Sequence, residues 1–355
     1  MPGGALTRVR ALVVTWQAAT MLPECLDSLL AQDVDPALLE VVVVDNASTD
    51  GTRELLARAY PTVRVIASDR NRGFAGGVAL GLADFDGDAV VLLNNDARLD
   101  LGAVRALLDA LAGDRVGAAT ARVLLAGQWR RTAGATSVSP DGRSAWEPAG
   151  GGDPAGVVLV NSTGNVVHAD GSGGDRDWLV PADEEHADPE VFGFYGGASA
   201  LRWEAVVEAG GIDADLFLYY EDTDLSWRLR AHGWRVVYVR DAVARHRHAA
   251  SSGATSPLFR YYNTRNSLVV ATRHAPGLVV LRAWLRQAGG LIRAALRDGP
   301  GAGVTTARGR ALRDALVRLP RSLAERRSLW AGAAVTRRDA LRAVGPPPPP
   351  PRAHS

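Results

Sequence analysis

The sequence contains no lysine, so its 40 Lys-plus-Arg positions are all arginine. A phosphate-binding loop that depends on a lysine is therefore excluded. The only cysteine is Cys25, which excludes a disulfide framework and a zinc site built from thiolates. Long apolar runs are also absent, because residues 277–296, the nearest candidate for a membrane span, are interrupted by three arginines. No signal peptide precedes the first apolar strand pattern at residues 9–15, so we expect a cytoplasmic protein, soluble or peripheral.

The net charge of +1 hides an uneven distribution along the 355 residues. From Ser256 to the end there are 18 Arg and 4 acidic residues, a balance of +14. The preceding part has 22 Arg and 35 acidic residues, a balance of −13. The sequence therefore predicts an acidic body followed by a basic appendage.

Short apolar runs alternate with helical patterns in the first hundred residues. We predict strands at 10–15, 40–44, 63–67 and 89–93, with helices between them, one of them opening at Ser48 or Asp50. A further helix is predicted at 222–232 and a strand at 235–240. Such alternation is typical of βαβ units, so we expect an α/β fold with a mostly parallel sheet.

Composition divides the chain into three parts. Residues 1–255 form the predicted α/β domain, in which the Gly-, Asp- and Pro-rich stretch 126–190 is a loop-rich insertion. Residues 256–343 are expected to form a basic helical region. Residues 344–355 include six consecutive prolines and are expected to be a disordered tail.

Polar side chains follow two of the predicted strands where each strand ends. Asp45 and Asn46 follow a run of four valines, and Asn94, Asn95 and Asp96 follow residues 90–93. Ligands of open α/β sheets bind at this carboxyl edge. A carboxylate there could accept from a base or ribose, or could bind Mg²⁺ or Mn²⁺ together with substrate phosphates. Ordinary turn and helix-capping chemistry explains Asp45 and Asn46 equally well.

Two clusters farther along the chain could complete such a site. Glu221, Asp222 and Asp224 precede or begin a helix, where capping explains one or two acids but less readily three. His246 and His248 are candidate metal ligands after the last strand, although each alone could be a polar loop residue.

The order and spacing of these segments resemble the bacterial family 2 glycosyltransferases of GT-A fold, especially rhamnosyltransferase-like members. The resemblance covers roughly residues 9–270 and is carried by these segments: VVTW (13–16), CLDSL (25–29), VDNASTDG (44–51), NRGFAGG (71–77), LLNNDA (92–97), GGA (196–198), EDTDLSWR (221–228), His248 with Ser251 and Ser252, and YYNTRN (261–266).

The resemblance implies an inverting hexosyltransferase that uses a nucleotide-diphosphate sugar and Mg²⁺ or Mn²⁺. Asp222 matches the catalytic base, and Asp96 matches the metal-binding aspartate of the DxD-like motif, with Asn94 in place of a first aspartate. His248 matches a histidine that completes the metal site in some members, with His246 as the alternative. The donor and acceptor are expected to contact Thr15, Asp45, Asn46, Arg72, Asn95, Glu221 and Trp227.

The resemblance also implies a role in cell-envelope polysaccharide synthesis. The expected donor is dTDP-rhamnose, or else a UDP-sugar, and the acceptor is a glycan or lipid-linked hydroxyl. The 126–190 insertion is then expected to lie on the acceptor side. Without the Gln/Arg-x-x-Arg-Trp signature of processive synthases, we expect transfer of one or very few sugars. The basic C-terminal region could contact the inner face of an anionic plasma membrane, or could simply be a solvated face.

Three other interpretations remain open at this level. A sugar-1-phosphate nucleotidyltransferase would need catalytic lysines, which are absent. A non-enzymatic nucleic-acid- or membrane-binding protein could use the Arg-rich region, but no reader motif occurs, so we expect no nucleic-acid partner. A catalytically inactive family member is permitted by Asn94 and disfavoured by Asp222.

Overall fold

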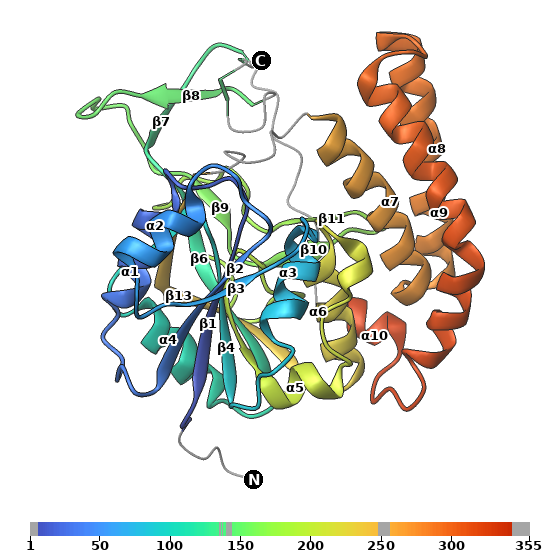
Figure 1. Cartoon of the computed structure of the whole chain (residues 1–355). Coiled ribbons are helices and arrows are strands. Elements are labelled where there is room, and N and C mark those ends of the chain that lie inside the picture. Colours follow the sequence, from blue (N-terminus) through green and yellow to red (C-terminus); the bar gives the residue numbers. More distant parts are fainter. Residues whose placement is uncertain (1–5, 135, 137, 140–143, 248–255, 343–355) are drawn as a thin grey trace.

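A nine-stranded mixed sheet forms the centre of the body (Figure 1). The computed structural model describes residues 6–134, 136, 138–139, 144–247 and 256–342. The strand order is β3-β2-β1-β4-β12-β6-β13-β5, and β9 also pairs with β6. The bounds are β1 Val9–Thr15, β2 Leu39–Asp45, β3 Arg64–Ala67, β4 Ala89–Asn94, β5 Ala97–Leu99, β6 Val116–Leu125, β9 Val160–Ser162, β12 Ala198–Arg202 and β13 Arg235–His246.

Parallel pairing joins the four strands predicted in the first hundred residues, whereas β5, β6, β9 and β12 were not predicted from the sequence. β3, β2, β1 and β4 run parallel to one another, and β13 runs parallel to β6. β12 lies antiparallel between β4 and β6, and β5 is antiparallel to β13. The parallel strands read as unbroken apolar runs because helices cover both faces of the sheet. The polar residues that follow β1, β2 and β4 therefore meet at one edge.

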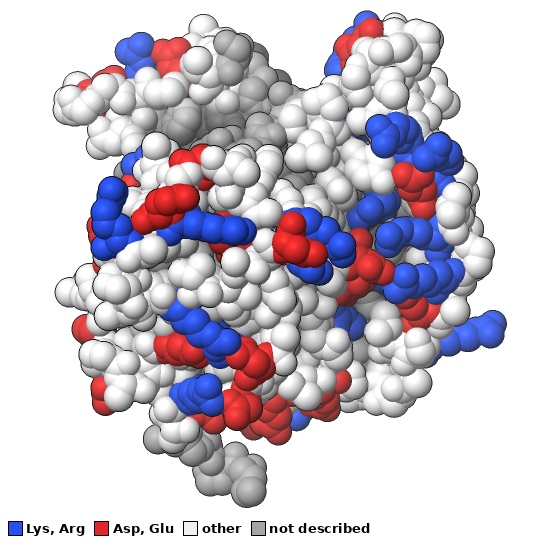
Figure 2. Space-filling model, viewed as in Figure 1, with Lys and Arg blue, Asp and Glu red and all other residues white. Residues whose placement is uncertain are grey.

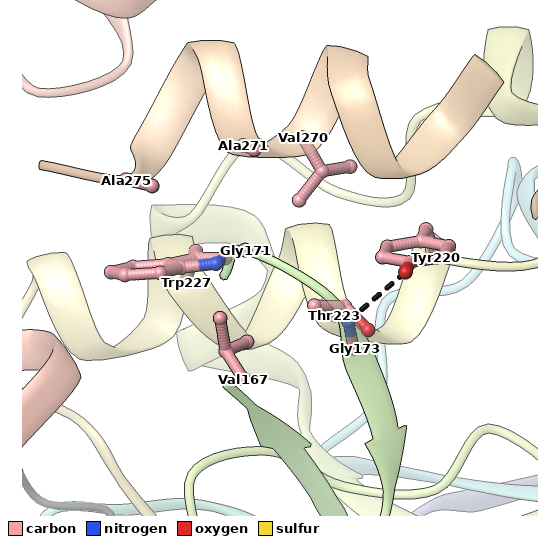
Figure 3. A pocket seen from close by; sticks show the side chains of 9 residues that line it. All are labelled: Val167, Gly171, Gly173, Tyr220, Thr223, Trp227, Val270, Ala271 and Ala275. Carbon is pink, nitrogen blue, oxygen red and sulfur yellow. Dashed lines mark hydrogen bonds between the residues drawn. The ribbon is translucent and has the colours of Figure 1, made fainter. Parts of the chain in front are cut away.

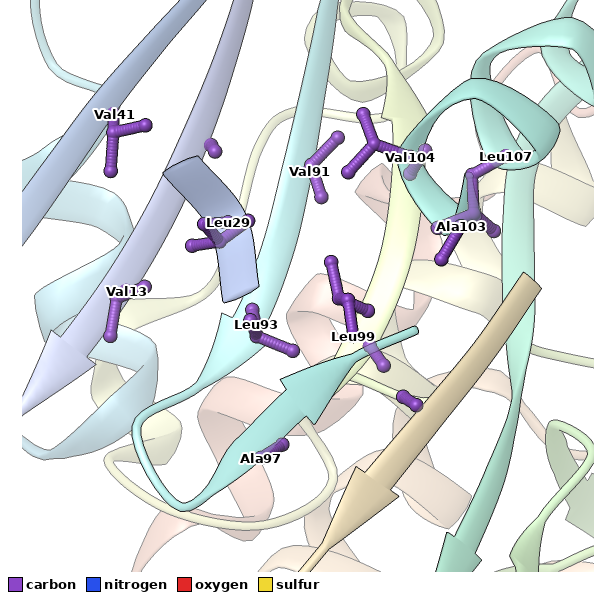
Figure 4. Close-up of a cluster of buried hydrophobic side chains, with 14 of the residues drawn as sticks. Val13, Leu29, Val41, Val91, Leu93, Ala97, Leu99, Ala103, Val104 and Leu107 are labelled. Atoms are coloured by element: carbon purple, nitrogen blue, oxygen red, sulfur yellow. The ribbon is translucent and has the colours of Figure 1, made fainter. Parts of the chain in front are cut away.

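Two helical layers enclose the sheet. One face is covered by α1 (Leu22–Leu30), α2 (Thr52–Ala59) and α4 (Ala103–Leu111), whose leucines pack on the valines of β1, β2 and β4 (Figure 4). The other is covered by α3 (Gly73–Gly81), α5 (Trp203–Glu208) and α6 (Glu221–Ala231). α2 begins at Thr52 after Gly51, a left-handed residue (φ 88°), slightly later than the predicted Ser48 or Asp50.

The 126–190 stretch has short strands that build two small hairpins. β7 (Gln128–Arg131) pairs with β8 (Trp146–Ala149), and β10 (Asn165–Val167) pairs with β11 (Gly173–Asp175). The first hairpin stands away from the sheet above its carboxyl edge (Figure 1). The second packs close to α6 and brings polar residues to the site described below.

The C-terminal region packs against α6 rather than standing apart. It contains α7 (Pro257–His274), α8 (Gly277–Asp298), α9 (Gly303–Ser328) and α10 (Arg337–Arg342). Buried residues of α7, α8 and α9 share one apolar cluster with Phe192 and Trp227 of the body. No helix in the described part of the chain is both long enough and apolar enough to span a membrane. The expected proline-rich tail at 344–355 lies outside the described residues.

Candidate active site

The ends of β1 and β4 bring two of the predicted binding residues into contact. Thr15 is the last residue of β1 and is buried, and its Oγ1 accepts a hydrogen bond from Nδ2 of Asn95 at 3.1 Å. In the parallel register Thr15 lies beside Asp45, and Val14 lies beside Asn94. The carboxyl edge of the sheet thus collects the polar residues of three strands.

Asp45, Asn46 and Arg72 are engaged mainly with their own loops. Asp45 is fully buried, and its carboxylate pairs with Arg53 and accepts from the backbone N–H of Ser48 at 3.1 Å. Asn46 donates from Nδ2 to the carbonyl of Gly73 at 2.9 Å, which ties the end of β2 to the start of α3. Arg72 pairs with Asp69 at 2.7 Å. These contacts fix the loops at the carboxyl edge of the sheet. They are the turn and capping contacts that the sequence allowed as an alternative to ligand binding.

Asp96 faces His246, not a residue of its own loop. Both side chains are buried, and Nε2 of His246 lies 3.0 Å from Oδ1 of Asp96. Asn161, from β9 of the insertion, places Oδ1 at 2.7 Å from Nδ1 of the same imidazole. His248, which the resemblance favoured as the metal ligand, lies outside the described residues. The structure therefore places the alternative histidine, His246, against Asp96.

This triad has the donor set of a divalent-cation site. When Nδ1 donates to Asn161, the Nε2 atom that faces Asp96 has either a proton or a free lone pair. A cation can take the place of that proton, because a carboxylate oxygen and a neutral imidazole nitrogen are both metal ligands. Among the described residues no group of three or more His, Cys, Asp or Glu side chains gathers here. Two protein ligands suit a metal whose remaining ligands are substrate phosphates and water.

Asp222 lies in the first turn of α6 and is held by four hydrogen bonds. Oδ2 accepts from the backbone N–H of Gly196 at 3.1 Å, and Oδ1 accepts from the backbone N–H of Thr223 at 2.6 Å. The Thr223 hydroxyl and Nδ2 of Asn165 also approach Oδ1 at 3.1 and 3.4 Å. Such contacts fix the carboxylate in one orientation, as a positioned general base requires.

Burial raises the pKa of Asp222, against the lowering effect of its hydrogen bonds from Gly196 and Thr223. The pKa of the neighbouring Glu221 is also raised, first by burial and then by the charge of Asp222. One carboxylate oxygen of Glu221 is buried without a hydrogen-bond partner. Perturbed carboxyl groups of this kind are typical of functional sites.

The segment from Tyr195 to Gly197 connects the two halves of the site. Gly196 donates to Asp222, and the Tyr195 hydroxyl lies 3.4 Å from Nδ1 of His246. A Cβ on Gly197 would lie 2.7 Å from Nδ2 of Asn94, so only glycine allows this close approach. The Gly-Gly-Ala motif therefore has a physical role, since it lets the chain pass between the Asp96 loop and α6.

Sequence reasoning missed three residues that the insertion contributes. Asn161 contacts His246, and Asn165 contacts Asp222. Asp175 lies close enough to Asp222 and His246 to interact with their charges. Burial, and then the charge of Asp222, raise the pKa of Asp175 to about 7, opposed by a hydrogen bond from Ser162 and by His246. The available signal was the polar run Asn161–Asn165 between two apolar positions, but only the folded hairpin shows where it points.

Asp224 anchors α6 to the C-terminal helices. Its carboxylate pairs with Arg228 at 2.7 Å and Arg273 at 3.3 Å, and accepts from Nε2 of His274 at 2.9 Å. Burial alone would raise the pKa of Asp224, but the charge of Arg228 and the contacts with His274 and Arg273 hold it well below its usual range. Trp330 donates to Nδ1 of His274 at 3.0 Å, so the proton on Nε2 faces Asp224.

Trp227 does not reach the edge of the sheet. It is 1% exposed and packs edge-on against Phe192 and parallel to His274, with ring centroids 4.9 and 6.1 Å apart. It also lines a small pocket between α6, α7 and the β10–β11 hairpin, where Tyr220 accepts a hydrogen bond from the backbone of Gly173 (Figure 3). The residues around this pocket are mostly apolar, so Trp227 stabilises the packing between these elements.

The loop before α6 has an unusual backbone that α7 holds in place. Phe217, Tyr219 and Tyr220 all have positive φ angles of 67–72°. Asn266 donates to the carbonyls of Leu216, Leu218 and Tyr219 at 2.8–2.9 Å. Strained backbone of this kind persists only where surrounding contacts over-determine it. The loop leads directly into Glu221 and Asp222, so these contacts set their position.

Two family models match the chain. "Glycosyl transferase family 2" matches residues 11–147, and "Glycosyl transferase family group 2" matches residues 187–331. The N-acetylglucosaminyl-diphospho-decaprenol L-rhamnosyltransferase of Mycobacterium tuberculosis is 30% identical over 258 residues, which is 68% of this chain and 76% of that protein. The chain belongs to glycosyltransferase family 2. It is a rhamnosyltransferase-like member, as the motifs predicted.

Further similarity is found to a shorter bacterial match and to two solved structures. The succinoglycan biosynthesis protein ExoO of Rhizobium meliloti is 37% identical over 89 residues, a quarter of this chain. Among solved structures, GalNAc-T7 with UDP, GalNAc and Mn²⁺ superposes with a TM-score of 0.58 at 15% identity, covering 90% of this chain and 58% of that chain. A mannosyltransferase from Pyrobaculum calidifontis, in complex with GDP-Man and Mn²⁺, has a TM-score of 0.50 at 19% identity, covering 91% and 85%.

These likenesses bear out the predicted GT-A fold, and the family establishes that this protein is a glycosyltransferase. They set aside the nucleotidyltransferase and the non-enzymatic interpretations. The roles of the individual site residues stay predictions, supported by the contacts described above.

Proposed function

We propose that this family 2 protein transfers one sugar from a nucleotide-diphosphate donor to a hydroxyl of a lipid-linked or glycan acceptor in cell-envelope synthesis, with inversion at C1. dTDP-rhamnose is the first donor candidate and a UDP-sugar the second. The mycobacterial relative is named for L-rhamnosyl transfer to a decaprenol-diphosphate-linked sugar, and it supports both the donor and a lipid-linked acceptor. Hydrolysis or transfer with a panel of nucleotide sugars would identify the donor.

The observation that carries the proposal is the link between Asp222 and the Asp96–His246 pair. The short Tyr195–Gly197 segment contacts both, through the Gly196 N–H on Asp222 and the Tyr195 hydroxyl beside His246. Glycosyl transfer with a diphosphate leaving group needs a general base and a group that binds the diphosphate. Both lie at the carboxyl edge, where Thr15, Asp45 and Asn95 would face the nucleotide.

In the proposed step, Asp222 takes the proton of the acceptor hydroxyl while the hydroxyl oxygen forms a bond to C1 of the sugar. The bond from C1 to the diphosphate oxygen breaks at the same time, and its electron pair leaves with the nucleoside diphosphate. A base held in position typically contributes about 10²–10⁴-fold in rate. Glu221 lies beside Asp222 and would orient the acceptor or the helix.

Asp96 and His246 would hold Mg²⁺ or Mn²⁺, which supplies charge neutralisation at the diphosphate when bound. Asn161 fixes the imidazole so that Nε2 faces Asp96. Asn94 stands where the DxD-like pattern has its first aspartate, and its neutral amide lowers the negative charge available to the cation. We therefore expect a weaker metal site than two aspartates would give.

The deciding experiment compares wild type with Asp222→Asn. Binding of each nucleotide sugar would be measured calorimetrically with and without Mn²⁺, and turnover by release of the nucleoside diphosphate. Asp222→Asn should keep metal-dependent donor binding and lose about 10²-fold or more in turnover. Asp109→Asn, an exposed position on α4, is the matched control and should behave as wild type.

Two results would contradict the proposal. Failure of any nucleotide sugar to bind in a metal-dependent way would remove the donor assignment. Full turnover by Asp222→Asn would remove the base assignment while leaving the transferase in place. Product stereochemistry, read by NMR at the new anomeric centre, tests inversion separately.

A further inference from the structure

The outermost face of α8 is apolar, although the C-terminal region as a whole is basic. Fifteen large hydrophobic side chains are exposed among the described residues, and five of them lie on α8. They are Leu278, Leu281, Leu285, Ile292 and Leu296, with exposed fractions of 58%, 55%, 63%, 60% and 83%. Monomeric proteins rarely expose contiguous apolar patches of this kind without a use for them.

The spacing gathers these five side chains into one stripe. At 3.6 residues per turn, their directions around the helix axis fall within about 60° of each other, and they span about 27 Å along the axis. The residues that pack into the protein point about 180° away, and they are Val279, Ala283, Gln287, Gly290 and Ala294. The stripe is therefore the ridge of α8 farthest from the core, and packing within this chain does not account for its hydrophobicity.

Four arginines lie along one flank of the stripe. Arg282, Arg286, Arg293 and Arg297 project about 40–100° from Leu278, and the only acidic residue of α8 is Asp298 at its end. Figure 2 shows many arginine side chains over the C-terminal helices, with fewer acidic side chains among them. An apolar ridge beside a cationic flank is the pattern of a helix that lies in the interface of an anionic bilayer, with its axis parallel to the surface.

We propose that the ridge of α8, comprising Leu278, Leu281, Leu285, Ile292 and Leu296, inserts into an anionic membrane surface, with the arginine flank at the lipid phosphates. This inference rests on the proposed function in one respect: a lipid-linked acceptor would be found at the membrane surface. The C-terminal end of α8 lies on the same side of the molecule as the carboxyl ends of β1 and β4 (Figure 1).

Charge decides between a membrane and a second copy of the chain. Antiparallel packing of two α8 ridges about a two-fold axis would set the arginine flanks against each other. Asp170 and Asp298 offset Arg286 and Arg297, but Arg282 and Arg293 of each copy would have no acidic partner on α8. Arg286 already pairs with Asp170 and Arg297 with Asp298, so a surface of acidic lipids chiefly complements Arg282 and Arg293. The narrow stripe also suits shallow insertion, since arginine side chains can extend from the apolar boundary to the phosphates.

Vesicle binding by the full chain tests the proposal. Wild type should co-sediment with phosphatidylglycerol-containing vesicles and much less with pure phosphatidylcholine vesicles. The double variant Leu285→Glu/Ile292→Glu should bind at least about tenfold more weakly, because two inserted side chains become charged. The matched control is Leu101→Glu, an exposed leucine of the body (74%), which should bind as wild type. Wild-type binding by the double variant, or no binding by wild type, would overturn the proposal.

A fluorophore distinguishes insertion from simple adsorption, and it does not depend on how the double variant folds. The native Cys25 is buried, and burial raises the pKa of its thiol far above the usual value, so it is not expected to react with a label. An environment-sensitive dye on Leu285→Cys should shift to the blue with anionic vesicles, whereas the same dye on Leu101→Cys should not. Equal spectra with and without vesicles at both positions would contradict insertion.

Two controls separate this proposal from the proposed function and from self-association. The double variant should keep donor hydrolysis and transfer to a water-soluble acceptor, and lose transfer to an acceptor embedded in vesicles. If the protein binds vesicles but turns over no sugar nucleotide, the membrane-binding proposal is supported and the proposed function is contradicted. A dimer measured by light scattering that the double variant dissociates, without vesicle binding, would identify a second copy as the occupant instead.

Discussion

At the residue scale, Asn161 contacts one ring nitrogen of His246, and Asp96 contacts the other. It is fully buried, it accepts from Nδ1 of the imidazole at 2.7 Å, and it comes from a strand of the insertion. Second contacts of this kind orient metal ligands and typically affect metal affinity by 10–100-fold when removed. The insertion therefore reaches the Asp96–His246 pair, and we propose that it serves the donor end of the site as well as the acceptor side expected from the sequence.

Asn161→Ala should weaken Mn²⁺ binding by about 10–100-fold, because His246 loses the contact that keeps Nε2 directed at Asp96. Calorimetry or electron paramagnetic resonance would measure the affinity in the absence of any sugar nucleotide. Asn263→Ala is the control, because that asparagine lies on α7 and not on the strands that carry Asn161 and His246. Unchanged Mn²⁺ affinity in Asn161→Ala would show that Asn161 has no part in the metal site.

The raised pKa of Asp222 predicts the acid side of the pH profile. The base works only when ionised, so kcat/KM should fall as pH drops through the pKa of Asp222, at a pH above the usual 3.8 of an aspartate. The same shift means that the stability contribution of this group is greatest below its unfolded pKa and is lost as pH rises through its folded pKa. A pH–rate profile with a soluble acceptor gives the value. An acid limb at or below 3.8 would contradict the effect of burial.

At the element scale, α6 is positioned by α7 through two independent sets of contacts. Asp224 binds Arg273 and His274 of α7, and Asn266 of α7 holds the three carbonyls of the loop before Glu221. The EDTDLSWR and YYNTRN motifs therefore act together, although 32 residues lie between them. Breaking either contact would leave buried charged or polar groups unpaired, which costs far more than a surface contact.

Asn266→Ala should lower kcat by about tenfold or more and change metal and donor affinity little, because it frees the loop that places Asp222. It should also lower the free energy of unfolding by about 1–3 kcal/mol, through the carbonyls left without their donor. Asn263→Ala, on the same helix, is the matched control. Chemical denaturation and steady-state kinetics give the two quantities. A loss in stability with an unchanged kcat would mean that the asparagine is only structural.

At the scale of the whole molecule, the C-terminal region is joined to the body by a shared core. Trp227 and Phe192 of the body pack in one cluster with residues of α7, α8 and α9, and Trp330 reaches His274 beside Asp224. The second family model extends to residue 331, across the boundary that composition placed at 255. We propose that residues 256–342 complete the catalytic domain and also provide its membrane-facing surface.

Removal of residues 256–355 should therefore yield a body that unfolds at a lower temperature and binds a hydrophobic dye, because Phe192 and Trp227 lose their cover. Calorimetry and dye fluorescence on the truncated and full chains would measure both. Removal of residues 343–355 alone is the control and should leave the melting temperature unchanged. A truncated body as stable as the full chain would show that residue 255 is a true domain boundary.

The sequence by itself determined the parallel half of the sheet and the family, and it predicted candidate site residues at the ends of the strands. Unbroken apolar runs give these strands, their polar endings lie at one edge because parallel strands must end together, and the ordered motifs identify the family. It did not determine which histidine meets Asp96, that Asn161, Asn165 and Asp175 reach the site, that Trp227 is core, or that the exposed ridge of α8 is aliphatic. Local patterns specify elements, whereas these facts depend on contacts between residues dozens to more than a hundred positions apart, and only the packed chain decides them.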